Sequence, residues 1–258
     1  MKTLLTISFD GSGFSGFQYQ PGVPTVQGSL TGAARKLFGD GCLITGCSRT
    51  DAGVHALGFR ATLELPGGAR PKIDIGKIPD AMNFYLPESV SVLSAEEVPD
   101  SFHPRYSVVD KTYSYLISLS HRRMPLTVGR VYTPPAPMDG HALETMDAAA
   151  RLLEGKRDFA SYMASGSKIT DTVRTIRSAS VRAEHGVAVI TLTADGFLYN
   201  MVRIISGTLL DIAYKGGDPG LISRITEARD RKAAGPTLPP YGLYLVSVNY
   251  DAAGDGVL

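Results

Sequence analysis

Residues 46–58 read GCSRTDAGVHALG and place an arginine and an aspartate two positions apart, shortly before a glycine. If the chain is extended here, alternate side chains share a face, so Arg49 and Asp51 point the same way. Gly53 permits a sharp change of direction immediately afterwards. Taken alone, the pattern also fits a solvated loop ion pair, which is a common and weak surface feature. Other segments of the chain are needed to choose between a site and a surface loop.

The composition is that of an ordinary folded protein. Of the 258 residues, 43% are apolar and 20% are charged, which suits one large domain or two smaller ones. The formal net charge of +1 neither favours nor excludes an anionic partner.

Cysteine spacing and apolar runs indicate the compartment. Cys42 and Cys47 form a single C-x₄-C pair, which supports neither a disulfide framework nor a four-ligand zinc site. The first residues, MKTLLTISFDG, contain too short an apolar stretch for a signal peptide. No later run approaches the ~18 apolar residues of a membrane span. We therefore expect a cytoplasmic protein with no membrane contact and no metal centre.

The first 100 residues alternate between strand and helix patterns. Leu5, Ile7 and Phe9 alternate with polar residues and predict a half-buried strand, and Gly39 ends a stretch with helical spacing. The expected elements are strands at 4–10, 58–66 and 89–98 and helices at 25–38 and 77–86. With one more strand, whose bounds the pattern does not give, the expected order is strand, helix, strand, strand, helix, strand, which resembles a ferredoxin-like unit.

A second set of elements follows. Tyr113, Tyr115 and Ile117 share one face of an alternating stretch, which predicts a strand. The expected elements are strands at 111–119, 173–183, 187–195 and 241–250 and helices at 139–153, 198–214 and 221–234. We therefore expect two α+β halves, at 1–105 and 106–250, and a loose tail at 251–258.

Residues 11–16, GSGFSG, match the dinucleotide-binding pattern directly after a strand. That pattern must open a helix whose N-terminus faces a pyrophosphate, but Pro21 and Pro24 prevent a regular helix here. A loop near a site is the better interpretation, in which Phe14, Phe17 and Tyr19 would offer apolar or stacking surface. No nucleotide cofactor is expected.

Two further side chains, Arg203 and Tyr113, each fit both a structural and a functional role. Arg203 lies in LYNMVRIISGTLL, on a helix that is apolar around much of its circumference. An unpaired buried charge costs several kcal/mol, so Arg203 either faces an anion or extends to solvent or a structural carboxylate. Tyr113 fits a core aromatic, although a ring on a cleft-facing strand can also stack on a nucleobase, a contact worth roughly 1–3 kcal/mol.

Six long motifs follow one another along the chain. They are FSGFQYQPGVPTVQGSL, SRTDAGVHA, RYSVVDKTYSY, DFASYMA, DGFLYNMVRIISGTLL and AGPTLPPYGLYLV. In this order they resemble the tRNA pseudouridine synthase A family across essentially the whole chain. The resemblance implies the α+β pseudouridine synthase fold, with two ferredoxin-like halves and mixed sheets around a central RNA-binding cleft, and a homodimer. Bacterial members isomerise uridines 38, 39 and 40 of the tRNA anticodon stem-loop, so tRNA is the expected partner.

The resemblance also implies roles for individual residues. Asp51 would be the catalytic nucleophile, Arg49 the base-flipping arginine, Tyr113 the stacking tyrosine and Arg203 the arginine that pairs with the aspartate. Isomerisation leaves the overall composition of the RNA unchanged, so no redox cofactor, metal or ATP is expected. The sequence leaves open whether Asp51 attacks ribose C1′ or uracil C6, or acts as a base at C2′ to give a glycal.

Two positions depart from the family pattern, and two alternatives remain. Phe17 stands where tryptophan is frequent, and Tyr241 replaces a commoner histidine or glutamine. A paralogous synthase with a different RNA target is one alternative. The other is a non-catalytic RNA-binding protein on the same fold, which would keep Tyr113 but would not need Asp51 paired with Arg203.

Overall fold

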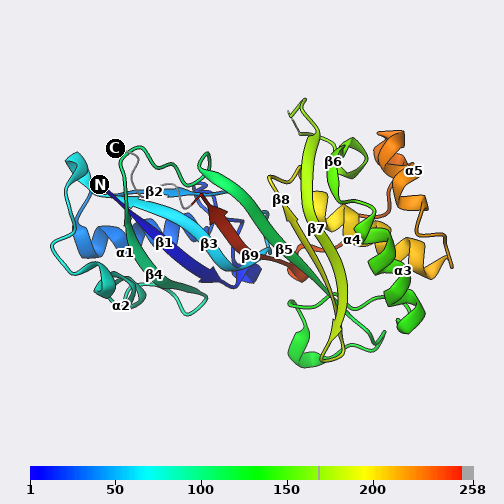
Figure 1. The fold of residues 1–258 in the computed structure, drawn as a ribbon. Coiled ribbons are helices and arrows are strands. Elements are labelled where there is room, and N and C mark those ends of the chain that lie inside the picture. Colours follow the sequence, from blue (N-terminus) through cyan, green and yellow to red (C-terminus); the bar gives the residue numbers. More distant parts are fainter. Residues whose placement is uncertain (168, 252–258) are drawn as a thin grey trace. The chain divides into compact units, whose positions relative to one another are not determined.

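The structure, a computed structural model, describes residues 1–167 and 169–251. The chain divides into two compact units (Figure 1). Unit 1 contains Met1–Val109 and the C-terminal segment from Leu245, and unit 2 contains Asp110–Tyr244. None of the helices in the described residues is long and apolar enough to cross a membrane.

These units differ from the expected halves at both boundaries. The sequence pattern predicts a change of half at residue 105, whereas the chain enters unit 2 at Asp110. The second half was expected to continue to residue 250, but the chain returns to unit 1 in its last strand, and residues 245–250 belong to that unit. The tail expected at 251–258 lies outside the described residues, apart from Asp251.

Unit 1 has the element order predicted for a ferredoxin-like unit. Its elements are β1 (Lys2–Phe9), α1 (Val26–Phe38), β2 (Leu43–Gly46), β3 (His55–Glu64), α2 (Ile78–Asn83) and β4 (Val90–Val98), followed at the C-terminus by β9 (Leu243–Tyr250). The sheet order is β4-β1-β3-β9, with β2 paired to β3. Strand β1 runs antiparallel to β3 and β4, and β2 runs antiparallel to β3. The helices contact each other, α1 also contacts β2, and α2 contacts β4.

Local sequence explains the first elements of unit 1. Leu5 and Ile7 of β1 are fully buried, as the alternating pattern predicts. The Thr25 side chain caps α1 by accepting a hydrogen bond from the Gly28 amide at 3.2 Å, which satisfies one of the amides that have no partner inside the helix. Gly39 follows the helix with φ of +89°, a conformation that favours glycine.

Unit 2 combines a sheet with three helices. Its elements are β5 (Val108–Ser118), α3 (Gly140–Arg151), β6 (Gly155–Asp158), β7 (Val173–Glu184), β8 (Val187–Ala194), α4 (Met201–Tyr214) and α5 (Leu221–Ala228). The sheet order is β5-β8-β7-β6, and these three ladders are antiparallel. Helix α3 packs on β7 and on α4.

Two helices of unit 2 are shorter than predicted because single residues turn the backbone. Helix α4 begins at Met201 rather than 198, since Asn200 adopts left-handed angles of φ 59° and ψ 11°. Helix α5 ends at Ala228 rather than 234, since Arg229 is left-handed with φ 51°. Strands β2 and β6 have four residues each, which is too short for a periodic pattern to reveal.

Candidate active site

Asp51 opens a tight turn that ends at Val54. The Val54 amide donates a hydrogen bond to the Asp51 carbonyl oxygen at 3.2 Å, and Gly53 has φ of +79°. Arg49 is exposed, Asp51 is partly exposed, and Thr50 between them is buried. The two charged side chains are therefore more accessible than the threonine, as the alternation in the sequence predicts.

The GSGFSG loop packs directly against this turn. A Cβ atom at Gly11 would lie 2.0 Å from the Val54 carbonyl oxygen, and one at Gly16 would lie 2.4 Å from the Thr50 carbonyl oxygen. The Phe17 amide donates to that same Thr50 oxygen at 3.3 Å. The two glycines thus permit contact between backbones. The loop supports the Asp51 turn and begins with a short 3₁₀ turn, Gly11–Gly13, instead of the α-helix that a dinucleotide site needs.

His55 joins the start of this loop to β3. Its side chain is 2% exposed, and its Nδ1 lies 3.1 Å from the Gly11 amide and 3.2 Å from Asp10 Oδ1. One nitrogen cannot accept from Gly11 and donate to Asp10 at once, but either arrangement ties the loop to the first residue of β3. His55 stands four residues after Asp51. Its contact with Gly11 and Asp10 therefore holds the start of the GSGFSG loop against the segment that directly follows the Asp51 turn. His55 belongs to the SRTDAGVHA motif but was not among the residues expected at the site, because its partners are distant along the chain.

Phe17 does not offer the stacking surface expected of it. Its side chain is 3% exposed and stacks on Phe59 with ring centroids 4.2 Å apart and planes at 23°. Gly46 leaves room for this pair, since a Cβ there would lie 2.4 Å from the Phe17 ring. The position at which the family pattern often has tryptophan is a core position in this protein. Tyr19, by contrast, is 62% exposed.

Tyr113 lies on β5 in unit 2. Its side chain is 7% exposed and meets the Phe197 ring edge to face, with centroids 5.1 Å apart and planes at 83°. This geometry is favourable for two aromatic rings. Phe197 therefore holds the Tyr113 ring in one orientation. Phe197 belongs to the DGFLYNMVRIISGTLL motif but was not among the residues expected at the site.

Tyr115, two residues further along β5, is a structural residue. It is fully buried, and its hydroxyl donates to the Pro239 carbonyl oxygen at 2.7 Å. Burial raises the pKa of Tyr115 far above its usual range, so the hydroxyl stays protonated and available as a donor. A Cβ at Gly242 would lie 2.7 Å from this ring. The PPYG segment therefore packs against β5.

Arg203 is held by two neutral oxygen atoms. Its Nε donates to the Leu238 carbonyl oxygen at 2.7 Å, and its Nη1 donates to Asn200 Oδ1 at 2.6 Å. The Leu238 amide donates in return to the Arg203 carbonyl oxygen at 3.3 Å. These bonds fix the plane of the guanidinium group, because its donors have a rigid geometry. The side chain is partly buried and is anchored by backbone and amide oxygens.

Glycines allow the AGPTL segment to lie against α4. A Cβ at Gly207 would lie 2.0 Å from the Pro236 carbonyl oxygen, and one at Gly235 would lie 2.7 Å from the Thr208 Cα. The Gly235 amide also donates to Thr208 Oγ1 at 2.9 Å. This close packing brings Leu238 to the first turn of α4, where it meets Arg203.

The structure places the four expected residues in pairs. Arg49 and Asp51 lie in the same loop of unit 1, whereas Tyr113 and Arg203 belong to unit 2. Within unit 2, the contacts of Tyr113 and Arg203 converge on one short segment, since Phe197 and Asn200 are three residues apart before α4. Among residues 1–167 and 169–251, no group of three or more His, Cys, Asp or Glu side chains is arranged to hold a metal ion.

Comparison with known proteins identifies the family. A family model described as tRNA pseudouridine synthase matches residues 149–251. The "tRNA pseudouridine synthase A" of Caldicellulosiruptor saccharolyticus is 42% identical over 247 residues, which cover 96% of this chain and 98% of that protein. Proteins of the same name from Thermoanaerobacter sp. (strain X514) and Bacillus pumilus are 38% and 39% identical, over 96% and 97% of this chain and 99% and 100% of those proteins.

A solved structure described as a Cbf5-Nop10-Gar1 complex aligns more distantly. The TM-score is 0.36 at 11% identity, and the alignment covers 94% of this chain and 57% of that chain. That likeness is too weak to define a fold or an activity, so the assignment rests on the sequence relatives. Identities of 38–42% over nearly the full length of both proteins show that this chain belongs to the tRNA pseudouridine synthase A family, whose members are isomerases with the α+β pseudouridine synthase fold.

Proposed function

We propose that this protein converts uridine to pseudouridine in tRNA, at positions 38, 39 and 40 of the anticodon stem-loop, with Asp51 as the catalytic carboxylate. The full-length similarity to proteins named tRNA pseudouridine synthase A carries the proposal. The Asp51 turn supports it, because two glycine contacts and a buried histidine hold this one loop. We also propose that the enzyme acts as a homodimer in the cytoplasm, as the family resemblance implies.

The reaction rearranges one nucleotide. The bond between ribose C1′ and uracil N1 breaks, the base turns, and a bond forms between C1′ and C5; C5 loses a proton and N1 gains one. An aspartate is an anion at neutral pH, so Asp51 can attack C1′ or C6, or remove a proton from C2′. Dividing the isomerisation into two steps lowers the barrier that each step must cross.

The other three residues bind and position the substrate. A uridine in a stem is stacked and must be flipped out, at a cost of a few kcal/mol; the exposed Arg49 is suited to fill the vacated space. We assign stacking on the flipped uracil to Tyr113, whose ring is already oriented by Phe197. We assign pairing with Asp51 to Arg203, because a nearby guanidinium favours the carboxylate form.

The target position can be tested with the whole protein and two transcripts. One is an unmodified tRNA with uridines in the anticodon stem-loop, and the other is the same tRNA with cytidine at positions 38, 39 and 40. We expect pseudouridine in the first transcript and none in the second. Equal modification of both transcripts would show that the enzyme has a different RNA target.

Replacing Tyr113 by phenylalanine separates stacking from proton transfer. The variant keeps the ring that contacts Phe197, so we expect unchanged affinity for tRNA. If stacking is the whole contribution, turnover is also unchanged; a hydroxyl that removes the C5 proton would lower turnover by about 10²–10⁴. Filter binding and single-turnover rates measure the two quantities. Weaker binding with normal turnover would contradict both roles.

Replacing Arg203 by lysine keeps the charge and removes the rigid pair of donors. One ammonium group cannot reproduce the geometry that reaches both Leu238 and Asn200. We expect the free energy of unfolding to fall by about 2 kcal/mol, the scale of a hydrogen bond from a charged group, together with a loss of turnover. Urea denaturation and tRNA turnover check this result. A variant as stable and as active as the parent would show that these two contacts do not position Arg203.

A further inference from the structure

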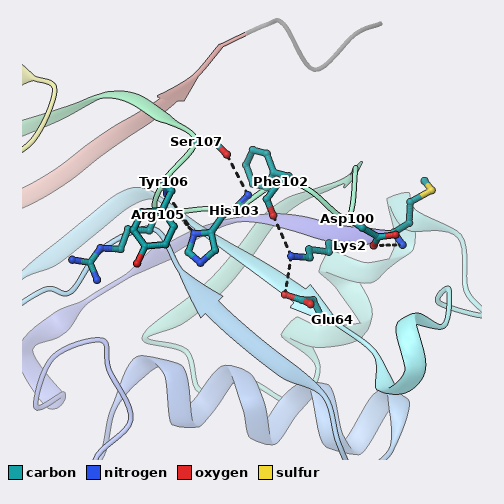
Figure 2. Close-up of polar contacts among 9 residues, drawn as sticks. Lys2, Glu64, Asp100, Phe102, His103, Arg105, Tyr106 and Ser107 are labelled. Carbon is teal, nitrogen blue, oxygen red and sulfur yellow. Dashed lines mark hydrogen bonds and ion pairs between the residues drawn. The ribbon is translucent and has the colours of Figure 1, made fainter. Parts of the chain in front are cut away.

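Residues 102–107, FHPRYS, form a tight turn in unit 1 between β4 and β5 (Figure 2). The Ser107 amide donates to the His103 carbonyl oxygen at 3.0 Å. In the opposite direction, the His103 amide donates to Ser107 Oγ at 3.2 Å. These two bonds close the turn at both ends, and the four residues from His103 to Tyr106 therefore form one structural element, named here the HPRY turn.

The imidazole of His103 organises the inside of this turn. Its Nδ1 accepts hydrogen bonds from the amides of Arg105 at 3.1 Å and Tyr106 at 3.4 Å. The imidazole also lies beside the Tyr106 ring, with centroids 4.3 Å apart and planes at 33°. Because backbone donors occupy Nδ1, a neutral His103 carries its proton on Nε2. The histidine thus supports the tyrosine ring and fixes its backbone.

The HPRY turn is anchored to the sheet of unit 1. The Lys2 ammonium group of β1 donates to the Phe102 carbonyl oxygen at 3.2 Å, and its Nζ lies 3.5 Å from Oε1 of Glu64 in β3 (Figure 2). From β9, the Tyr250 hydroxyl donates to the Pro104 carbonyl oxygen at 2.8 Å. The centroid of the Tyr250 ring lies 4.9 Å from that of the Phe102 ring. Burial raises the pKa of Tyr250, which keeps this donor protonated. Strands β1 and β9 therefore hold the base of the turn, and Glu64 of β3 pairs with the lysine that makes one of these contacts.

The anchored turn exposes an aromatic ring, Tyr106, and a cation, Arg105, to solvent. Tyr106 is 77% exposed, so core packing does not account for its position. The Arg105 guanidinium carbon lies 5.8 Å from the centroid of the Tyr106 ring, and Arg105 is itself exposed. Proteins bind single-stranded nucleic acid with this combination: aromatic rings stack on bases and basic side chains contact phosphates.

We propose that the HPRY turn is an RNA-binding site, in which Tyr106 stacks on an unpaired base and Arg105 contacts a neighbouring phosphate. The inference rests on the proposed function, which makes tRNA the substrate. Holding the ring in place before the RNA arrives reduces the entropy lost on binding. The turn contributes affinity and takes no part in the chemical step.

The test measures the dissociation constant of the whole protein for an unmodified tRNA transcript. A stacked base contributes roughly 1–3 kcal/mol, so we expect Tyr106→Ala to weaken binding by about 5- to 150-fold. Tyr106→Phe should bind as the parent does, and Tyr106→Leu should resemble the alanine variant because leucine has no π face. Phe84→Ala is the matched control, since Phe84 of the same unit is 82% exposed and has a ring neighbour in Tyr85.

The salt dependence of binding tests the cation. Removing one phosphate contact with Arg105→Gln should reduce the slope of log K against log salt by about one, whereas Tyr106→Ala should leave that slope unchanged. At saturating tRNA, all variants should form pseudouridine at the parent rate. An unchanged slope for Arg105→Gln would overturn its assignment to a phosphate.

Several outcomes would overturn the proposal for Tyr106. Parent-like affinity of Tyr106→Ala, equal losses for Tyr106→Ala and Phe84→Ala, or full affinity of Tyr106→Leu would each exclude base stacking. A change in association state on sedimentation, without a change in tRNA affinity, would make the turn a contact between copies of the chain. If the parent isomerises tRNA but Tyr106→Ala binds normally, only this inference fails. If the parent does not isomerise tRNA, the proposed function fails.

Discussion

Replacement of Asp51 by asparagine is expected to abolish pseudouridine formation and to leave tRNA binding nearly unchanged. Asparagine has the size of aspartate but lacks the anionic oxygen needed for attack or proton removal. The turn itself should persist, because Val54 bonds to the backbone carbonyl of residue 51. Affinity for RNA comes mainly from phosphate contacts and base stacking by other residues. Carbodiimide labelling with primer extension measures the product, and filter binding measures the complex.

Stability must be measured in parallel for this variant. If Arg203 pairs with Asp51, the substitution leaves a guanidinium opposite a neutral amide, and breaking a buried ion pair can cost roughly 3–5 kcal/mol. Thermal unfolding of the variant shows whether lost activity is merely lost structure. A folded variant that binds tRNA and still forms pseudouridine near the parent rate would remove Asp51 from the mechanism. The loop ion pair would then be the remaining interpretation of Arg49 and Asp51.

A methyl group at Gly11 is expected to destabilise unit 1 and to impair catalysis. The Cβ of Gly11→Ala would lie 2.0 Å from the Val54 carbonyl oxygen and 2.6 Å from its carbon, so the backbone of the loop or of the Asp51 turn must move. Overpacking of this kind costs about 1–3 kcal/mol, and occasionally more. Urea denaturation should show this loss. Turnover should fall further than stability alone explains, because the displaced turn carries Asp51.

Gly13→Ala provides the matched control. Gly13 lies in the same 3₁₀ turn, but a Cβ there would meet no atom within 4 Å. We expect its stability and turnover to equal those of the parent. If Gly11→Ala and Gly13→Ala behave alike, close contact between the loop and the turn does not matter for activity.

Periodic patterns predicted the long elements of this fold because burial of one face imposes them. Strand β1 and helix α1 follow directly from the spacing of residues such as Leu5 and Leu30. The helix ends at Asn200 and Arg229 could not be predicted in this way, since a left-handed residue other than glycine has no periodic signature. Short strands also escaped detection. The last strand shows a further limit, because a sequence pattern does not say which unit a returning strand joins.

The sequence proposes residues for the candidate site but does not reveal the contacts that support them. Motif resemblance singled out Asp51 and Arg203, but their supports are contacts between distant segments. Gly11 meets Val54 across more than forty residues, and Arg203 meets Leu238 across 35. The GSGFSG stretch illustrates the difference: its sequence predicts a loop near a site, but does not show that two of its glycines allow close contact between two backbones. Such a role becomes visible only when both segments are placed together.

Release of tritium from tRNA labelled with 5-³H-uridine tests the central claim most directly, because formation of the bond between C1′ and C5 expels the label from C5. Purified protein incubated with unmodified labelled tRNA should release tritium to the solvent, in an amount that matches the pseudouridine recovered from the RNA. The account predicts this release for the parent protein and none for Asp51→Asn. Tight binding of tRNA by the parent without any tritium release would contradict it and would indicate an RNA-binding protein that does not isomerise uridine.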